Sequence, residues 1–202
     1  MRRLSAGRVR ALLVHAPVLY WASAIALLLA SAPQGANAAS DLFLRPRGGA
    51  PAPSGAQTLC QTYSWACARG AGVSGEEAMR RVIAVNRQVN TSVHAIDDDQ
   101  QYGVSEYWAL PTATGGDCED FALLKKRELV AQGVDPRSLL IATVLDRGRN
   151  PHAVLVFRSD RGDLVLDNLT DQVRNWRETR YVFLQMQDPD RPTGWVNVFT
   201  SG

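Results

Sequence analysis

The chain has 202 residues, a length that fits one globular domain with a short appendage rather than two full domains. Its formal net charge of +2 includes four arginines among residues 1–38, which contain no acid or lysine, so the remainder carries −2. That remainder has no basic stripe and no Lys/Arg cluster interleaved with aromatic residues, which argues against nucleic acid as a partner.

The N-terminus has the layout of a signal peptide. Four arginines in the first ten residues precede an uncharged apolar run over residues 11–32, and small residues follow at Ala36 and Ala38. We expect residues 1–38 to be a signal peptide that is cleaved after Ala38. The run is also long enough to span a bilayer, so an uncleaved N-terminal anchor is the alternative. In both cases the rest is exported, and no later segment is apolar for long enough to cross a membrane.

Cysteines occur at positions 60, 67 and 118, and export would place them where disulfides persist. We expect Cys60 and Cys67 to pair, because they are close in sequence and no other chemical motif surrounds them. Cys118 then remains as a free thiol within an acidic motif. The alternative is that Cys118 is a buried structural thiol, but acidic neighbours on both sides argue against an apolar site.

Residues 39–58 are rich in Ala, Pro, Gly and Ser, and this composition predicts a linker or a loosely docked arm. We expect the folded domain to cover residues 59–202. Its first long helix is predicted to begin at Ser74, which has the capping-box spacing to Glu77, and to end near Val93. The expected apolar face consists of residues at helical spacing: Met79, Val82, Ile83, Asn86, Val89 and Val93.

A second helix is predicted after Asp117, a good N-cap, with Cys118 at its first position and Gly133 at its end. Strand-like runs follow at residues 139–145, 153–157, 164–167, 181–184 and 195–199. Helices followed by a run of strands indicate the α+β class with an antiparallel sheet.

Cys118 is the candidate nucleophile. A thiol attacks as its thiolate, and the partial positive charge at a helix N-terminus lowers the pKa of a thiol there, as does a nearby imidazolium. The neighbouring carboxylates of Asp117, Glu119 and Asp120 have the opposite effect on that pKa. A group that neutralises them is therefore expected.

His152 is the candidate base, because His15 lies in the leader and His94 at the end of the first helix. A histidine beside an apolar strand is more often a packed or capping residue, and a strand-ending aspartate such as Asp167 more often forms a turn. The alternative is that both are catalytic, because strand pairing can bring His152 and Asp167 to the same face of the sheet.

That relation depends on the connection at residues 159–162. A two- or four-residue connection pairs residues whose numbers add up to 321, such as Arg158 with Asp163. Asp167 then faces Val154, and the side chains of His152 and Asp167 project from the same sheet face as diagonal neighbours. A three-residue connection would place them on opposite faces. In the first register Asp167 can fix the tautomer of His152, and His152 can take the thiol proton.

Three motifs carry a family resemblance. Residues 116–125 read Gly-Asp-Cys-Glu-Asp-Phe-Ala-Leu-Leu-Lys, residues 152–155 read His-Ala-Val-Leu, and residues 166–169 read Leu-Asp-Asn-Leu. They resemble the bacterial transglutaminase-like cysteine proteinases of the LapG type, over a span from about Cys60 to Trp195. Pro151 departs from the glycine expected before the histidine. The resemblance implies a papain-like, transglutaminase-like α+β fold, with the helix bearing the catalytic cysteine packed on an antiparallel sheet.

The resemblance also implies an activity: a periplasmic endopeptidase with a Cys118, His152 and Asp167 triad. Such enzymes cleave the N-terminal region of a large surface adhesin, which controls attachment and biofilm, and an inner-membrane cyclic-di-GMP receptor inhibits them. A transglutaminase or deamidase acting on glutamine side chains would use the same three residues, because the acyl-enzyme intermediate is shared. A non-catalytic binding module that retains the fold is the third alternative.

The acidic residues around Cys118 also raise the question of a metal. Oxygen ligands of this kind suit a hard divalent ion such as Ca²⁺, whereas capping of the helix by Asp117 is an equally good explanation from residue types alone. LapG-type enzymes need calcium bound beside the catalytic cysteine, and the resemblance places Asp117 and Glu119 at those positions. Asp120 is a weaker assignment. The three aspartates at 97–99 either contribute a calcium ligand from a loop or are simply solvated.

Overall fold

The computed structural model describes residues 42–202. The segment expected to be a signal peptide lies outside these residues. Within the described part of the chain, no helix combines the length and the apolar character needed to cross a membrane.

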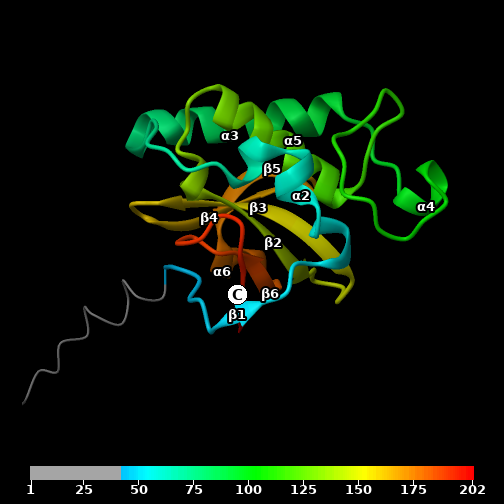
Figure 1. Ribbon diagram of the computed structural model, residues 1–202. Helices are drawn as coiled ribbons and strands as arrows, with labels where there is room; N and C mark the ends of the chain where they lie inside the picture. The colour runs from blue at the N-terminus through cyan, green and yellow to red at the C-terminus, as the bar shows by residue number, and fades with distance from the viewer. Residues whose placement is uncertain (1–41) are drawn as a thin grey trace, which may run out of the picture. The chain divides into compact units, whose positions relative to one another are not determined.

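A sheet of seven strands forms the centre of the fold within residues 42–202 (Figure 1). Its order is β1-β7-β6-β2-β3-β4-β5, and all neighbouring strands pair antiparallel. The strands are β1 (Gly49–Ala50), β2 (Leu139–Leu145), β3 (Pro151–Ser159), β4 (Gly162–Asp167), β5 (Thr170–Asn175), β6 (Val182–Gln187) and β7 (Trp195–Ser201).

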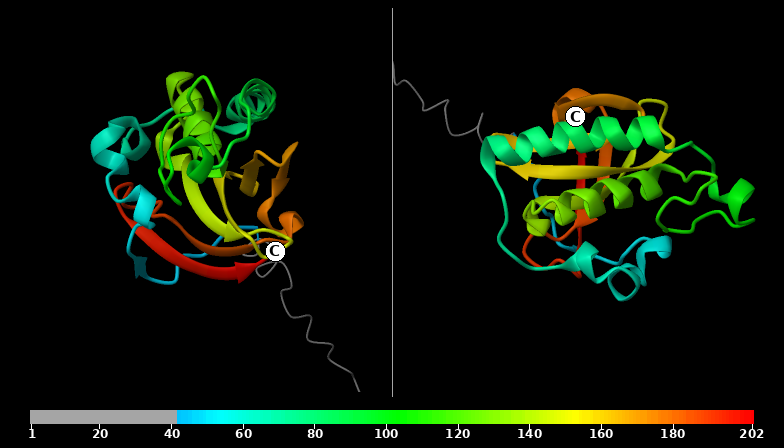
Figure 2. Two further views of the ribbon diagram at one scale, coloured as in Figure 1. Left: turned by 90° about the vertical axis from the view of Figure 1, so that its right-hand side faces the viewer. Right: turned by 90° about the horizontal axis from the view of Figure 1, so that it is seen from above.

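Two long helices, α3 (Gly75–Ser92) and α5 (Cys118–Ala131), lie side by side over one face of the sheet (Figures 1 and 2). Shorter helical segments complete the fold: η1 (Ser54–Ala56), α2 (Leu59–Thr62), η2 (Ser64–Cys67), α4 (Asp98–Gln101), η3 (Pro136–Ser138) and α6 (Trp176–Thr179). Helix α4 belongs to a long loop that projects beyond the sheet (Figure 1). Mixed helices on an antiparallel sheet agree with the α+β class expected from the sequence.

Alternation along the central strands divides the core between the two sheet faces. In β2, Leu139 and Ile141 pack with the helices, whereas Leu140, Ala142 and Val144 belong to a second apolar cluster on the opposite face. Trp176 of α6 and Leu44 contribute to that second cluster, which therefore has its own cover. Burial on both faces is why β2 reads as a continuous apolar run.

Helix α3 begins and ends within one residue of the expected positions, but two details differ. Ser74 occupies the N-cap position without a side-chain capping hydrogen bond, so the capping box does not form. The buried face is rotated from the expected one, and Ile83 is 49 % exposed. The residues buried by α3 are Ala78, Val82, Val85, Asn86 and Val89.

Residues 42–58 differ from the expected linker or loosely docked arm, because they are held along the sheet. Arg158 pairs with buried Asp163 and donates to the carbonyl of Leu44 (2.9 Å), while Asp163 Oδ2 accepts from Leu44 N (2.8 Å). Strand β1 pairs with β7, and the Leu44 side chain is buried. The folded unit thus includes residues before Leu59, docked by the ion pair of half-buried Arg158 with buried Asp163, which composition does not reveal.

All five expected strands are present, and two further strands occur. Strand β5 is a polar edge strand, and β1 has two residues, so neither carries an apolar alternation that a sequence could display. Between β3 and β4 the register is the one in which paired residue numbers add up to 321, since Arg158 faces Asp163 and Leu155 faces Leu166. The register prediction is confirmed.

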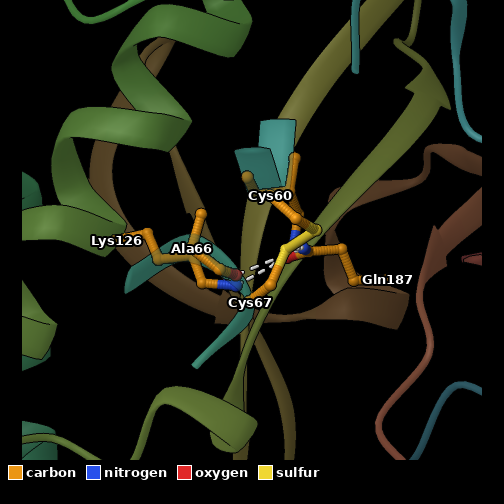
Figure 3. Close-up of a disulfide and its surroundings, with 6 residues drawn as sticks. Cys60, Ala66, Cys67, Lys126 and Gln187 are labelled. Carbon is orange, nitrogen blue, oxygen red and sulfur yellow. Dashed lines mark hydrogen bonds between the residues drawn. A yellow bond between two sulfur atoms is a disulfide. The ribbon is translucent and has the colours of Figure 1, made fainter. Parts of the chain in front are cut away.

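The structure joins Cys60 and Cys67 in a disulfide beside the middle of α5 (Figure 3). Gln187 of β6 connects α5 with the loop that the disulfide closes. Its Oε1 accepts from the buried Lys126 Nζ (2.6 Å), and its Nε2 donates to the carbonyl of Ala66 (3.3 Å). Burial lowers the pKa of Lys126 to about 7. One amide side chain thus links α5, β6 and the disulfide loop.

Candidate active site

Cys118 is the first residue of α5, and a glycine turn delivers the chain to it. Gly115 has φ of +128°, and a side chain there would lie 2.1 Å from the carbonyl oxygen of His94. The same carbonyl accepts from Gly116 N (3.1 Å), and Gly116 O accepts from Ile96 N (3.1 Å). Close backbone contact therefore requires glycine at position 115 and fixes the start of the helix.

The thiol of Cys118 is free and half-buried, and it lies between β3 and an acidic side chain. Ala153 N donates to Sγ (3.3 Å), and Sγ–H donates to Glu119 Oε2 (3.2 Å). Burial, followed by the negative charge of Glu119 and its hydrogen bond, raises the pKa of this thiol; the contact with Ala153 N acts in the opposite direction. Without a compensating cation the thiol is held protonated.

His152 and Asp167 meet as the register predicts. The imidazole Nε2 lies 2.9 Å from Asp167 Oδ1, and both side chains are almost fully buried. Asp167 Oδ1 also accepts from Leu169 N (3.0 Å), and Oδ2 accepts from the Tyr181 hydroxyl (2.6 Å). Burial would raise the pKa of Asp167, but the hydrogen bonds and charge of His152, with the Tyr181 bond, hold it below the usual range. This leaves Nδ1 of His152 available to a thiol.

Two asparagines of α3 hold the turn that carries Asp167. Asn90 Nδ2 donates to the carbonyl of Asp167 (2.9 Å) and to Thr170 O (3.1 Å), while Asn86 Nδ2 donates to the carbonyls of Thr170 (3.2 Å) and Asp171 (3.1 Å). Sequence reasoning assigned Asn86 to the apolar face and missed this role. The only available signal was a pair of amides spaced by one helical turn.

Three carboxylates gather beside Cys118: those of Asp98, Asp117 and Glu119. One oxygen of each lies within 4.8 Å of the others. Asp117 Oδ1 and Glu119 Oε1 are buried without a hydrogen-bond partner among the described residues. Burial and the charge of Asp117 raise the pKa of Glu119 to about 9, and burial also raises the pKa values of Asp117 and Asp98. The arrangement suits a bound cation.

The expected third ligand, Asp120, is not in this group. Its Oδ1 accepts from Ala109 N (2.8 Å), its Oδ2 is buried without a hydrogen-bond partner among the described residues, and burial raises its pKa to about 7. Asp98, from the aspartate run at the start of α4, takes the third place instead. Its Oδ2 accepts from the backbone N–H of Tyr107, which fixes the loop after α4.

A cavity of about 610 Å³ connects these groups. Cys118 and His152 line it together with the three clustered carboxylates, and exposed Leu169 lies at its edge. Two of the three residues predicted to be catalytic, Cys118 and His152, thus line one accessible cavity. Asp167 does not line it; it lines a separate small hollow together with Arg147 and Tyr181, among others.

The comparisons with known proteins agree with this architecture. LapG of Legionella pneumophila in its calcium-bound form superposes with a TM-score of 0.52 at 24 % identity, covering 72 % of this chain and 87 % of that one. Its EGTA-treated form gives 0.52 at 23 % identity, with coverages of 76 % and 91 %. These likenesses show a shared transglutaminase-like fold. No curated protein matches the sequence.

A sequence model of the family described as bacterial transglutaminase-like cysteine proteinase matches residues 47–201. The match covers nearly all of the described chain, including the cysteine, histidine and aspartate motifs. The protein is therefore a member of the bacterial transglutaminase-like cysteine proteinase family and a cysteine protease.

Proposed function

We propose that this protease is a calcium-dependent endopeptidase in which Cys118 is the nucleophile, His152 the general base and acid, and Asp167 the residue that orients His152. The observation that carries the proposal is the 2.9 Å contact of His152 with Asp167, since His152 also lines the cavity that contains the free thiol. Packing alone does not explain why a thiol, an imidazole and a carboxylate occur together at a helix start and on two adjacent strands.

The chemistry follows from the hydrogen bonds. Asp167 engages Nε2, so His152 Nδ1 accepts the proton of the Cys118 thiol, and Asp167 stabilises the imidazolium that forms. The thiolate attacks the peptide carbonyl, and His152 returns the proton to the leaving amine. Water then hydrolyses the acyl-enzyme and regenerates the thiol. The positive end of α5 and the N–H of Ala153 both favour negative charge at Sγ.

The ligands proposed for calcium are Asp98, Asp117 and Glu119. Their fit rests on the two buried carboxylate oxygens without partners and on the mutual proximity of the three groups. A bound divalent cation would supply the positive charge that offsets these carboxylates and lowers the pKa of Cys118. Glu119 Oε2, which now accepts Sγ–H, would then no longer compete with His152 for the thiol proton. The related LapG structures, described as calcium-bound and EGTA-treated, support calcium as the ion.

The proposed compartment is the periplasm, reached through the signal peptide of residues 1–38. The proposed substrate is the N-terminal region of a large surface adhesin, whose cleavage would control attachment and biofilm, and an inner-membrane cyclic-di-GMP receptor is the proposed inhibitor. These three assignments follow from the resemblance to LapG-type enzymes rather than from a contact in this chain.

The decisive experiment compares secreted and surface proteins from cells carrying the wild-type chain or Cys118→Ala. An N-terminally shortened adhesin that is present only with the wild type supports the proposal, and sequencing its new N-terminus gives the cleavage site. Release of ammonia without a new N-terminus would instead identify a deamidase or transglutaminase. A profile that is identical in both strains would favour the binding module.

A further inference from the structure

We propose that Tyr181 is a positioning residue of this active site, which holds the Asp167 carboxylate and the His152 ring in the orientation that serves Cys118. The inference rests on the proposed triad and adds a residue that none of the sequence motifs contains. Tyr181 begins the segment that leads into β6, 29 residues after His152 in the sequence.

The first line of argument is the carboxylate. The Tyr181 hydroxyl donates to Asp167 Oδ2 at 2.6 Å, while His152 Nε2 and Leu169 N contact Oδ1. A carboxylate with partners on only one oxygen can rotate about its Cβ–Cγ bond. With a donor on each oxygen its plane is fixed, and Oδ1 stays directed at the imidazole.

The second line is the imidazole itself. The rings of Tyr181 and His152 meet edge to face, with centroids 5.9 Å apart and an interplanar angle of 90°. This geometry is a favourable one for two aromatic rings, and it restricts rotation of the imidazole about its side-chain bonds. One side chain therefore contacts two members of the triad through two different groups, a hydroxyl and a ring.

A positioning residue must itself be held, and Tyr181 is. Arg180 ends α6 in the left-handed conformation with φ of 61°, which turns the chain sharply. The backbone N of Tyr181 then donates to Thr179 Oγ1 (3.1 Å), and its carbonyl accepts from Gly202 N (2.9 Å). Arg147 secures the same turn by donating to Thr179 O (3.0 Å). The ring is buried in the apolar cluster that Trp176 also joins.

The hydroxyl is a constant donor. Burial raises the pKa of Tyr181, and the hydrogen bond to the negatively charged Asp167 raises it further. The phenol therefore stays protonated at any pH at which the enzyme would work, and its hydrogen is committed to Oδ2. A role in packing alone would need the ring and not this bond, so the two roles can be separated by removing a single oxygen atom.

The test uses the purified exported protein with calcium in the buffer and measures the rate at which iodoacetamide alkylates Cys118 at neutral pH. Intact mass reports the reaction, and no protease substrate is needed. Tyr181→Phe keeps the ring and deletes the hydroxyl. We expect alkylation to slow by about tenfold, the size of effect expected from losing one hydrogen bond to a charged group. We also expect the low-field proton signal of His152 Nε2–H to shift or broaden.

Tyr63→Phe is the matched control, because it also removes a hydrogen-bonded hydroxyl, the acceptor of Leu110 N (3.2 Å), at a site away from the cavity. This variant should alkylate at the wild-type rate, and the Tm of both variants reports folding. Wild-type alkylation in folded Tyr181→Phe, or an equal loss in both variants, would overturn the positioning role. His152→Ala separates the two hypotheses: if it alkylates as fast as the wild type, the triad itself is wrong.

Discussion

The two sides of the active-site cavity differ in how their polar atoms are satisfied. On the side of His152, each oxygen of Asp167 has a donor, and the pKa of Asp167 is held below its usual range. On the side of Asp117, one buried oxygen each of Asp117 and Glu119 has no hydrogen-bond partner among residues 42–202, and the pKa values of the clustered acids are raised. Cys118 lies between the two sides and contacts Glu119.

The difference separates two kinds of site. The histidine side is preorganised by the protein's own donors, so it needs no ligand to keep its geometry. The acidic side crowds carboxyl groups that have no cation beside them, so their pKa values are raised, and any charge they carry disfavours the thiolate next to them. We infer that the fold prepares the base in advance and leaves activation of the nucleophile to a cation.

The largest effect is expected from removing the Cys118 thiol, which lies between the two sides. Cys118→Ala should abolish peptide cleavage, because no covalent intermediate can form, and Cys118→Ser should do the same with a poorer nucleophile. His152→Ala should be comparably severe. Cleavage of an adhesin-derived fragment checks activity, and Tm checks folding, which should be unchanged because both cysteine replacements are small. Normal turnover in either cysteine variant would contradict the assignment.

A smaller loss is expected on the preorganised side. Asp167→Asn keeps the shape of the side chain but turns a carboxylate into an amide, which no longer stabilises the imidazolium and favours the wrong tautomer. A loss of up to about 10⁴-fold in kcat with residual turnover is the precedent for such a change in a catalytic triad. Steady-state kinetics should show the loss mainly in kcat. A variant that retains full kcat would show that Asp167 is only a turn residue.

On the acidic side, EGTA should suppress cleavage, and Asp117→Ala or Glu119→Ala should suppress it too. Each unit by which uncompensated charge raises the pKa of Cys118 reduces the thiolate by about tenfold, so we expect a loss of about 100-fold with EGTA. Glu119→Ala should lose less, because it also removes a carboxylate that raises this pKa. Asp99→Asn is the control, because Asp99 lines the same cavity but is exposed and outside the cluster. Full cleavage by the chelated enzyme would contradict the calcium assignment.

The contrast between the two sides also marks what the sequence could predict. The pairing of β3 with β4 follows from a short turn, so the contact of His152 with Asp167 could be worked out from residue numbers. The start of helix α5 and the place of Cys118 on it could likewise be predicted, because the residues that indicate them are neighbours in the sequence. The protease activity and the need for calcium came from the family resemblance.

What escaped prediction depends on contacts between distant segments. Asp98 comes from a run of three aspartates, and the path of the loop after α4 is what brings it, rather than its neighbours, beside Asp117 and Glu119. Tyr181, just before β6, and Asn90, in α3, reach Asp167 from distant parts of the chain, and a single sequence contains no pattern that links them. Asp120, the weaker assignment among the expected ligands, lies outside the cluster of three: its Oδ1 accepts from Ala109 N, while its Oδ2 has no hydrogen-bond partner among the described residues.

Stability should depend on pH in opposite ways on the two sides. The folded-state pKa of Glu119, about 9, lies above its ordinary value of 4.5, so ionising it destabilises the fold, and metal-free protein should lose stability as pH rises from about 5 to 9. The slope is at most about 1.4 kcal/mol per pH unit for one group. Asp167, whose pKa is lowered, should stabilise the fold above pH 3.8 and lose that effect as pH falls.

Urea denaturation in EGTA at several pH values measures this slope. Glu119→Gln should flatten it, because a neutral amide does not titrate, and calcium should flatten it in the wild type by keeping the carboxylates ionised and bound. A slope that is unchanged in Glu119→Gln would show that other groups cause it. Asp99→Asn again serves as the exposed control.

The smallest effect is expected away from both sides, at the disulfide. Alkylation of the oxidised protein should modify one thiol, Cys118, and modification of three would refute the Cys60–Cys67 pairing. Replacing both paired cysteines by Ser should cost about 2 kcal/mol, because the closed loop is short. Alkylation of Cys118 should stay at the wild-type rate, since the disulfide contacts α5 through Gln187 and Lys126 rather than through its N-terminal turn. A slower rate would mean that this amide link transmits strain along the helix to the thiol.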